Sequence, residues 1–336
     1  MELCDLLLML CQAYGPSGDE GEIREVISNW ARPYADEIFI DALGNLIVHK
    51  QGSGPKFLFA AHMDSIGFMV THITEDGFLR CGRLGGISPK ETVFSPVRFK
   101  NGVQGVFVKE EKADFGKLRL DECFLDIGAK SREEASAMVQ VGDTAIYDSA
   151  VRCNRRKVIS PYLDNRVSCA VLLMALKELG ECPNDLYFVF TVQEEVGLRG
   201  AKTAAYGLTP DWSFVVDVTD PDDTPGSEKT GTVQLGKGAG IKIMDHSVIC
   251  HPEAVRQLEL VAKIAAIPVQ REIMQDGGTD AGAIHASRMG VCTGGISVPC
   301  RYVHTPVEMV DLDDVDACIK LVIACSKTVY PNNSEQ

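Results

Sequence analysis

The sequence of 336 residues lacks long apolar runs and is poor in basic residues. No segment approaches the roughly 18 consecutive apolar residues of a membrane-spanning helix. Lysine and arginine number 33 against 47 aspartate and glutamate residues, which gives a formal net charge of -14. Nucleic acids and anionic membranes bind basic patches, so we expect neither as a partner. The segment Met1-Glu2-Leu3-Cys4-Asp5 has acids where a secretory signal needs positive charge, and we expect a cytoplasmic protein.

The sequence also lacks any Cys-x-x-Cys pair, although it contains 12 cysteines. They are scattered singly, and several fall among apolar residues in helix-patterned stretches. This spacing is typical of reduced, buried thiols in a cytoplasmic protein rather than of a disulfide framework. A Cys250/His251 nucleophile and base is disfavoured, because adjacent residues seldom reach each other productively.

Four apolar, strand-like runs lead into residues that can bind metal. Residues 56–61, 186–192, 211–216 and 291–298 are followed by His62, by Glu194-Glu195, by Asp217 and, after a short segment, by His304. Near-continuous apolar runs are typical of strands that are covered on both faces of a sheet. In open α/β sheets the ligand crevice lies beyond the carboxyl ends of the strands. The sequence therefore predicts that these side chains meet at one edge of a sheet.

Two further aspartates are candidates. Asp164 immediately precedes the helix-patterned stretch 167–179, where it can serve as an N-cap or lend an oxygen to a metal. Asp64 lies two residues after His62 on a strand end, so the two side chains point the same way. A histidine that binds metal usually gives its other ring nitrogen to a carboxylate, and Asp64 is placed for that role.

The candidate ligands are nitrogen and oxygen donors without sulfur. They are His62, Asp164, Glu195, Asp217 and His304. This donor set suits zinc, cobalt or manganese. Five ligands are too many for one catalytic ion with an open position, but they suit two ions that share a carboxylate, and Asp164 is the expected bridge. Because Glu194 and Glu195 point to opposite sides of an extended strand, a glycosidase with two carboxyls about one bond is disfavoured.

The order of patterns predicts an α/β protein with an inserted domain. Long helices alternate with buried strands in residues 1–66 and 160–336, which we expect to form the catalytic domain. Residues 67–159 instead contain short alternating strands with hairpin signals at Glu75-Asp76-Gly77 and Asn101-Gly102, interrupted by one short helix at 132–139. We expect a small β-rich, barrel-like domain there. Ser17-Gly18-Asp19-Glu20 predicts a capping box that opens a helix through Trp30.

Two polar loops have alternative interpretations. Gly277-Gly278-Thr279-Asp280 is rich in glycine, but no lysine follows as in a phosphate-binding loop, so a tight turn that lines the substrate pocket is expected. The acidic run Asp220-Pro221-Asp222-Asp223 is either a solvated loop or, because it follows Asp217 closely, part of the rim of the active site.

Taken together, these motifs resemble the dinuclear metallo-aminopeptidases in order and spacing. The resemblance is strongest to the tetrahedral aminopeptidase group, the glutamyl and leucyl aminopeptidases once described as endoglucanase M-like. It rests on His62-Met63-Asp64, Leu163-Asp164-Asn165-Arg166, Glu194-Glu195-Val196-Gly197, Asp217 and His304-Thr305-Pro306-Val307-Glu308, together with Pro16-Ser17-Gly18, Ile243-Met244-Asp245 and Gly277-Gly278-Thr279-Asp280-Ala281. It covers essentially the whole chain. It implies a zinc-peptidase-like α/β/α sandwich, with a mixed central sheet flanked by helices and an inserted domain for oligomerisation and as a lid.

The resemblance also implies two divalent metal ions per subunit, zinc, cobalt or manganese. His62 and Asp217 would hold one ion, Glu195 and His304 would hold the other, and Asp164 would bridge them.

The implied activity is that of a metal-dependent aminopeptidase acting on peptides with a free N-terminus. Glu194 would be the general base, with Asp64 and Glu308 as supports behind the ligands. The resemblance further implies a homo-oligomer, a dodecamer with active sites that face an inner cavity. Two alternatives stay open: a deacylase of N-acyl amino acids on the same scaffold, and a non-catalytic metal-binding scaffold.

Overall fold

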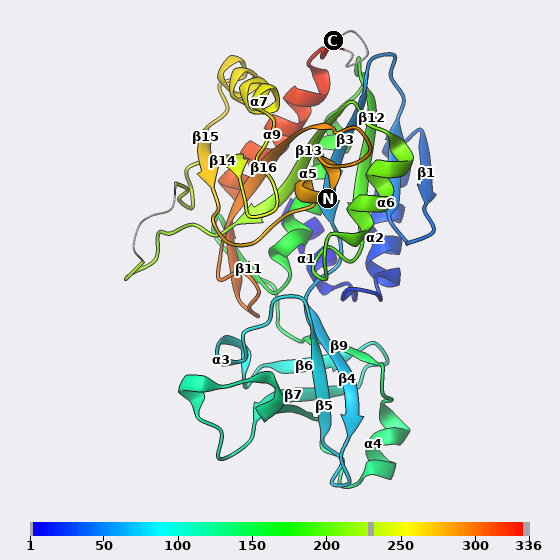
Figure 1. Ribbon diagram of the computed structural model, residues 1–336, viewed down its shortest axis with the longest axis vertical. Helices are drawn as coiled ribbons and strands as arrows, with labels where there is room; N and C mark the ends of the chain where they lie inside the picture. Colours follow the sequence, from blue (N-terminus) through cyan, green and yellow to red (C-terminus); the bar gives the residue numbers. More distant parts are fainter. Residues whose placement is uncertain (1–2, 228–231, 332–336) are drawn as a thin grey trace.

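The computed structural model describes residues 3–227 and 232–331 and shows a large α/β body above a small barrel (Figure 1). The strands of the large body are β1 (Glu37–Ile40), β2 (Leu46–Lys50), β3 (Lys56–His62), β10 (Arg152–Asn154), β11 (Lys157–Ser160), β12 (Asp185–Thr191), β13 (Trp212–Thr219), β14 (Ala239–Met244), β15 (Val269–Ile273), β16 (Cys292–Arg301) and β17 (Glu308–Asp311). They form one mixed sheet in the order β1-β2-β12-β3-β13-β16-β17-β11-β10, with β14 beside β16 and β15 beside β14.

The four central strands β12, β3, β13 and β16 run parallel to one another. Every residue of β13 is buried, and so is every residue of β3 and β16 apart from one end residue of each. A strand that is covered on both faces has no solvent side, which is why these runs are continuously apolar rather than alternating. Because parallel strands end at the same edge, their carboxyl ends meet as predicted.

Helices flank this sheet. They are α1 (Leu3–Gln12), α2 (Gly21–Ala31), η1 (Arg32–Tyr34), α5 (Leu163–Glu178), α6 (Arg199–Leu208), α7 (Pro252–Ile264), α8 (Ala281–Ile284) and α9 (Leu312–Lys327). Helix α5 packs against β3, β13 and β16 and contacts α1, α2 and α9, while α6 packs against β12 and α8. Within the described ranges, no helix combines the length and the apolar character needed to cross a membrane. The mixed sheet and its helices confirm the predicted fold class.

The inserted barrel is closed by β4 (Gly67–Ile73), β5 (Leu79–Leu84), β6 (Pro96–Phe99), β7 (Gln104–Lys109), β8 (Cys123–Asp126) and β9 (Thr144–Tyr147), with α3 (Pro89–Thr92), η2 (Phe115–Lys117), η3 (Leu120–Glu122) and α4 (Arg132–Met138) around it. Its core contains Phe68, Phe99, Phe107 and Leu125, all buried. The β4–β5 and β6–β7 hairpins turn at the two predicted signals. Strand β10 and all of β11 except Ser160 fall within the predicted insert of residues 67–159, but they pair with the large sheet through β17.

The predicted capping box is wrong. Helix α2 begins after Glu20, whose side chain makes no cap hydrogen bond. The Ser17 hydroxyl instead donates to Asp64 Oδ2 at 2.6 Å, and Glu20 Oε1 accepts from the Gly18 amide at 2.6 Å. The residue types fit a helix start, but a buried carboxylate from a distant segment competes for the serine hydroxyl.

Candidate metal centre and active site

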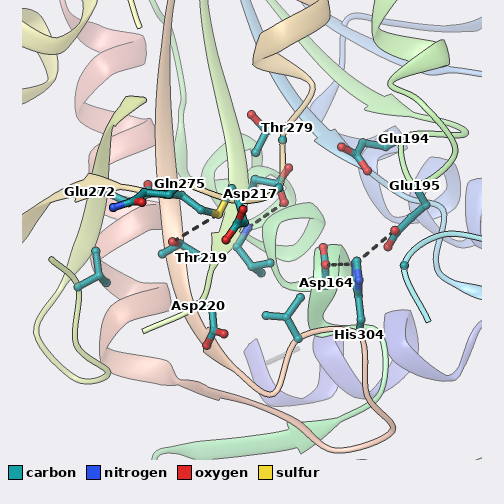
Figure 2. A pocket seen from close by; sticks show the side chains of 18 of the residues that line it. Asp164, Glu194, Glu195, Asp217, Thr219, Asp220, Glu272, Gln275, Thr279 and His304 are labelled. Atoms are coloured by element: carbon teal, nitrogen blue, oxygen red, sulfur yellow. Dashed lines mark hydrogen bonds and ion pairs between the residues drawn. The ribbon is translucent and has the colours of Figure 1, made fainter. Parts of the chain in front are cut away.

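The five predicted ligands come from separate segments and lie together at the carboxyl edge of the parallel strands. His62 is the last residue of β3, and Asp217 lies near the end of the adjacent β13. Glu195 follows β12, His304 lies in the turn between β16 and β17, and Asp164 lies in the irregular first turn of α5. Figure 2 shows four of these side chains around one hollow.

Asp164 is central to the cluster. Its Oδ1 lies 3.1 Å from His62 Nε2, and its Oδ2 lies 3.1 Å from His304 Nε2. Each carboxylate oxygen therefore faces a different histidine, which is the arrangement of a carboxylate that can bridge two ions. The N-cap interpretation does not fit, because Tyr162 occupies the N-cap position of α5 and Asp164 has non-helical backbone angles.

The remaining ligands divide into two groups about Asp164. His304 Nε2 lies 3.3 Å from Glu195 Oε2, and His62 Nε2 lies 3.8 Å from Asp217 Oδ1. Ligand atoms of His62, Asp164 and Glu195 all fall within 4.8 Å of one another. The second oxygen of Glu195, Oε1, is buried and has no hydrogen-bond partner among the described residues. A buried carboxylate oxygen without a donor, beside imidazole nitrogens, fits a cation as the missing partner.

The pKa shifts in the cluster also favour a bound cation. Burial lowers the pKa of His62, but the Glu194 and Asp164 carboxylates outweigh burial and raise that pKa well above its ordinary value. Burial raises the pKa of Glu194 well above its ordinary value, although His62 opposes the shift. Burial likewise raises the pKa of Asp217. These shifts favour protonated side chains in the cluster, and divalent ions would compete with those protons for the same atoms.

Glu194 is the one acid of the adjacent pair that lies away from Asp164. Its Oε2 is 4.0 Å from His62 Nε2, and its side chain lines the cavity at the edge of the cluster. Its amide donates to Asp64 Oδ1 at 3.0 Å, and the amide of Glu195 donates to Asp64 Oδ2 at 3.3 Å. A fully buried carboxylate thus fixes the backbone of both acids.

The structure places Asp64 differently from the expected pairing with His62. His62 Nδ1 lies 3.2 Å from the main-chain oxygen of Asp64, and its distance to the Asp64 carboxylate is longer, 3.6 Å. The nearest acceptor for the second ring nitrogen is therefore the carbonyl, while the carboxylate lies farther away and accepts from the two glutamate amides and from the Ser17 hydroxyl.

Glu308, the other expected support, is also fully engaged. Its Oε2 accepts from the Asp164 amide and its Oε1 from the His304 amide, each at 2.9 Å. The side chain is 1% exposed. One buried carboxylate thus fixes the backbone of two ligands that are far apart in the sequence.

The barrel also contributes to the site, which the sequence did not predict. Gly85 and Gly86 follow β5, and their backbone lies directly against two ligands. A Cβ atom on Gly86 would lie 2.7 Å from His304 Nδ1, and one on Gly85 would lie 2.7 Å from Glu195 Oε2. The Gly-Gly pair after a strand is a signal of close backbone approach, but it does not reveal what is approached.

A buried arginine is a second feature that the sequence did not predict. Arg166 is 0% exposed, and its guanidinium donates to the carbonyls of Leu10 at 2.7 Å, Ala13 at 3.4 Å and Gly15 at 3.1 Å. It therefore fixes the end of α1 and the start of the segment that presents Ser17 to Asp64. The motif Leu163-Asp164-Asn165-Arg166 contains this arginine, but its main-chain partners are not visible in the sequence.

A cavity of about 880 Å³ opens from the cluster. Beyond the ligands it is lined by Val218, Thr219, Asp220 and Met274 and by the turn that contains Gly277, Gly278 and Thr279 (Figure 2). This confirms that the glycine-rich turn lines the pocket. Asp245 shapes that turn, because its Oδ2 accepts from the Thr279 hydroxyl at 2.9 Å. A concave space of this size beside reactive groups is typical of a small-molecule or peptide site.

Comparison with known proteins identifies the family. Residues 44–321 match the M42 glutamyl aminopeptidase family. The chain belongs to the M42 family. A protein of Acetivibrio thermocellus with a provisional aminopeptidase name is 49% identical to this M42 chain over 323 residues, which cover 96% of the chain and 98% of the relative. The lysyl aminopeptidase of Pyrococcus furiosus is 37% identical, with 97% of both proteins covered.

Solved M42-like structures share the whole fold. Aminopeptidase APDkam598 from the archaeon Desulfurococcus kamchatkensis matches with a TM-score of 0.94 and 36% identity, covering 98% of this chain and 95% of that chain. The Pyrococcus horikoshii TET1 peptidase, which can assemble into a tetrahedron or a large octahedral shell, matches with a TM-score of 0.88 and 33% identity, covering 98% of this chain and 100% of that chain. The resemblance found in the sequence is confirmed at the level of family and fold.

Proposed function

We propose that this M42 chain is a metal-dependent aminopeptidase that removes N-terminal residues from peptides with the help of two divalent ions. The observation that carries the proposal is the position of Asp164, which presents one oxygen to His62 and the other to His304. With Asp217 on the first side and Glu195 on the second, this gives two sets of ligands that share one carboxylate. Nitrogen and carboxylate donors favour zinc, cobalt or manganese.

Bound divalent ions would acidify a water molecule and polarise the carbonyl of the cleaved bond. Glu194 is the proposed general base. It is not needed to hold Asp164 or His304, and its carboxylate borders the cavity within 4.0 Å of His62 Nε2. In this role Glu194 takes a proton from the attacking water and passes one to the leaving amine. Asp64 supports it by fixing its amide.

We also propose a cytoplasmic homo-oligomer, and specifically a dodecamer. Support comes from the high structural similarity to the Pyrococcus horikoshii TET1 peptidase, for which a tetrahedral assembly is described. Sedimentation or light scattering of the purified chain tests this proposal. A monomer at micromolar concentration would contradict it.

Two variants test the chemistry. Glu194→Gln keeps the size and the metal ligands, so we expect it to retain its ions and to lose activity by about 10²–10⁴-fold, the usual contribution of a general base. Asp164→Ala removes the shared ligand, and we expect it to lose bound metal. Metal content by mass spectrometry and hydrolysis of an aminoacyl coumarin amide provide the two measurements. Normal turnover by purified Glu194→Gln would overturn the assignment.

The same assay separates the alternatives. An aminopeptidase hydrolyses a dipeptide with a free amine and leaves its N-acetylated form intact, whereas a deacylase acts on the acetylated form. A metal-binding scaffold binds ions and hydrolyses neither substrate.

A further inference from the structure

The cavity extends mainly to one side of the metal cluster. Most of its lining residues come from the end of β13 and the segment after it, and from residues 272–279. Figure 2 shows Asp217, Thr219 and Asp220 on the side away from Glu194 and Glu195. A cleaved N-terminal residue must place its carbonyl at the ligands and within reach of Glu194. The larger part of the cavity is then left for its side chain.

This side of the cavity combines an apolar wall with acids. Val218 and Val233 are buried, and Met274 is half-buried, so their side chains offer an apolar surface for an aliphatic stem. Asp220 and Asp276 also line the cavity and are exposed. No lysine or arginine occurs among the described residues that line it.

Two cations near the cavity, both in the part of the chain that the structure describes, are already paired. The buried Lys242 forms an ion pair with Glu272, whose other oxygen accepts from a serine hydroxyl, so Glu272 brings no uncompensated charge to the wall. Arg301 Nε lies 2.6 Å from Asp223 Oδ1. Asp220, in contrast, has no ion pair with any residue in the described ranges, and its charged neighbours Asp222 and Asp223 are acids.

We propose that the N-terminal residue preferred by this chain is lysine or arginine. The aliphatic stem would lie along Val218 and Met274, and the cationic head would reach Asp220 at the acidic end of the cavity. The inference rests on the proposed aminopeptidase function and specifies its substrate class. It differs from the glutamyl preference in the family's name, because the described residues that line the cavity would offer a substrate carboxylate like charges and no lysine or arginine.

Norleucine is the apolar counterpart of lysine, because its side chain has the same unbranched carbon stem and lacks only the terminal amine. Coumarin amides of lysine, arginine, norleucine and glutamate are compared with the metal-loaded enzyme. We expect kcat/KM for lysine to exceed that for norleucine by about fivefold or more, the scale of one partly exposed ion pair, and glutamate to be the poorest substrate. Norleucine equal to lysine, or glutamate preferred, overturns the inference.

Asp220→Asn tests the residue itself. We expect the ratio of kcat/KM for lysine to that for norleucine to fall toward one, because the substitution removes the charge that distinguishes the two substrates. Asp76→Asn is the matched control: it changes the net charge by the same amount, lies in the exposed β4–β5 hairpin of the barrel, and should leave the ratio unaltered. An unchanged ratio in Asp220→Asn overturns the role of Asp220.

The two proposals fail in different ways. If norleucine and leucine amides are cleaved well but basic residues are not preferred, the aminopeptidase function stands and the substrate class is wrong. If no amide with a free amine is cleaved by the metal-loaded enzyme, the proposed function is wrong and the inference falls with it.

Discussion

The contact between the barrel and His304 leads to a specific prediction for Gly86→Ala. The added methyl carbon would lie 2.7 Å from His304 Nδ1 and 3.0 Å from Cε1. Ordinary van der Waals contact of a Cβ atom begins at 3.4 Å, so the imidazole or the loop must move by about 0.7 Å. The backbone of Gly86 does not have a positive φ, and alanine brings no conformational strain of its own. Any effect of the substitution on activity therefore comes from displacement of the imidazole or of the loop.

The size of the effect follows from the geometry that His304 must keep. Its Nε2 faces Asp164 at 3.1 Å and Glu195 at 3.3 Å, so the ring cannot shift without loosening both contacts. A misplacement of about 1 Å in an active site can lower the rate by about 10²-fold. We expect kcat/KM to fall by roughly 10- to 100-fold, equivalent to about 1.4–2.7 kcal/mol of transition-state stabilisation. Global stability should change by less than about 1 kcal/mol, because the contact is local.

Gly82→Ala is the matched control within the neighbouring strand β5. Its added Cβ would meet only Thr71 Cγ2, at 3.5 Å, which is ordinary contact, and this glycine also lacks a positive φ. For both variants, kcat/KM, bound metal per chain and the thermal midpoint are measured. We expect Gly82→Ala to match the unmodified chain in all three. If Gly86→Ala also retains full activity and full metal content, the barrel loop does not restrain His304 and the reasoning is refuted.

Three further predictions concern protons, thiols and the buried arginine. In the metal-free protein, burial lowers the pKa of His304, but the Glu195 and Asp164 carboxylates together outweigh burial and raise it to about 12, so metal must displace a proton from the imidazole. Calorimetric titration of the chain with a divalent metal, in buffers of different ionisation enthalpy, should show that binding releases protons and that the metal binds more weakly at lower pH. A metal affinity that is constant between about pH 6 and about pH 8 contradicts this. The Sγ atoms of Cys4 and Cys153 lie 3.3 Å apart, so oxidised glutathione should form a disulfide there with release of two reduced glutathiones. Peptide mapping detects it, Cys153→Ser abolishes it, and its absence in the unmodified chain contradicts the geometry. Arg166→Met should lower the free energy of unfolding by about 3 kcal/mol, since three carbonyls lose a charged donor; an unchanged denaturation midpoint would show that water replaces it.

The ligand cluster could be predicted from the sequence because its members follow a simple rule. Apolar runs covered on both faces become parallel strands, and parallel strands end at one edge of the sheet. His62 and Asp217 therefore approach each other through the pairing of β3 with β13, whatever the details of the loops. Asp164 is different, because the residues around it also fit a helix cap, and only its contacts with two histidines favour the proposed ligand role over the cap.

The supports of the cluster could not be predicted in this way, because their partners are set by tertiary contacts. Ser17 is the clearest case. Its position before an amphipathic helix favours a cap, yet its hydroxyl donates to Asp64. A hydrogen bond to a buried carboxylate is worth more than one at an exposed helix end, so the distant partner prevails over the local one.

The position of the barrel in the chain explains why it takes part in the site. The chain enters the barrel just after Asp64 and returns to the large sheet at β10, and the next strand, β11, ends at Ser160, four residues before Asp164. Ser65 further ties the entry to the large body, because its amide donates to the Gly15 carbonyl and its own carbonyl accepts from the Ser17 amide, each at 3.1 Å. The entry to the barrel therefore lies beside the ligand cluster. A rotation of the barrel cannot leave the site unchanged, since the loop that contacts His304 moves with it. An interface that fixes the barrel in an oligomer would thus also fix the positions of Glu195 and His304.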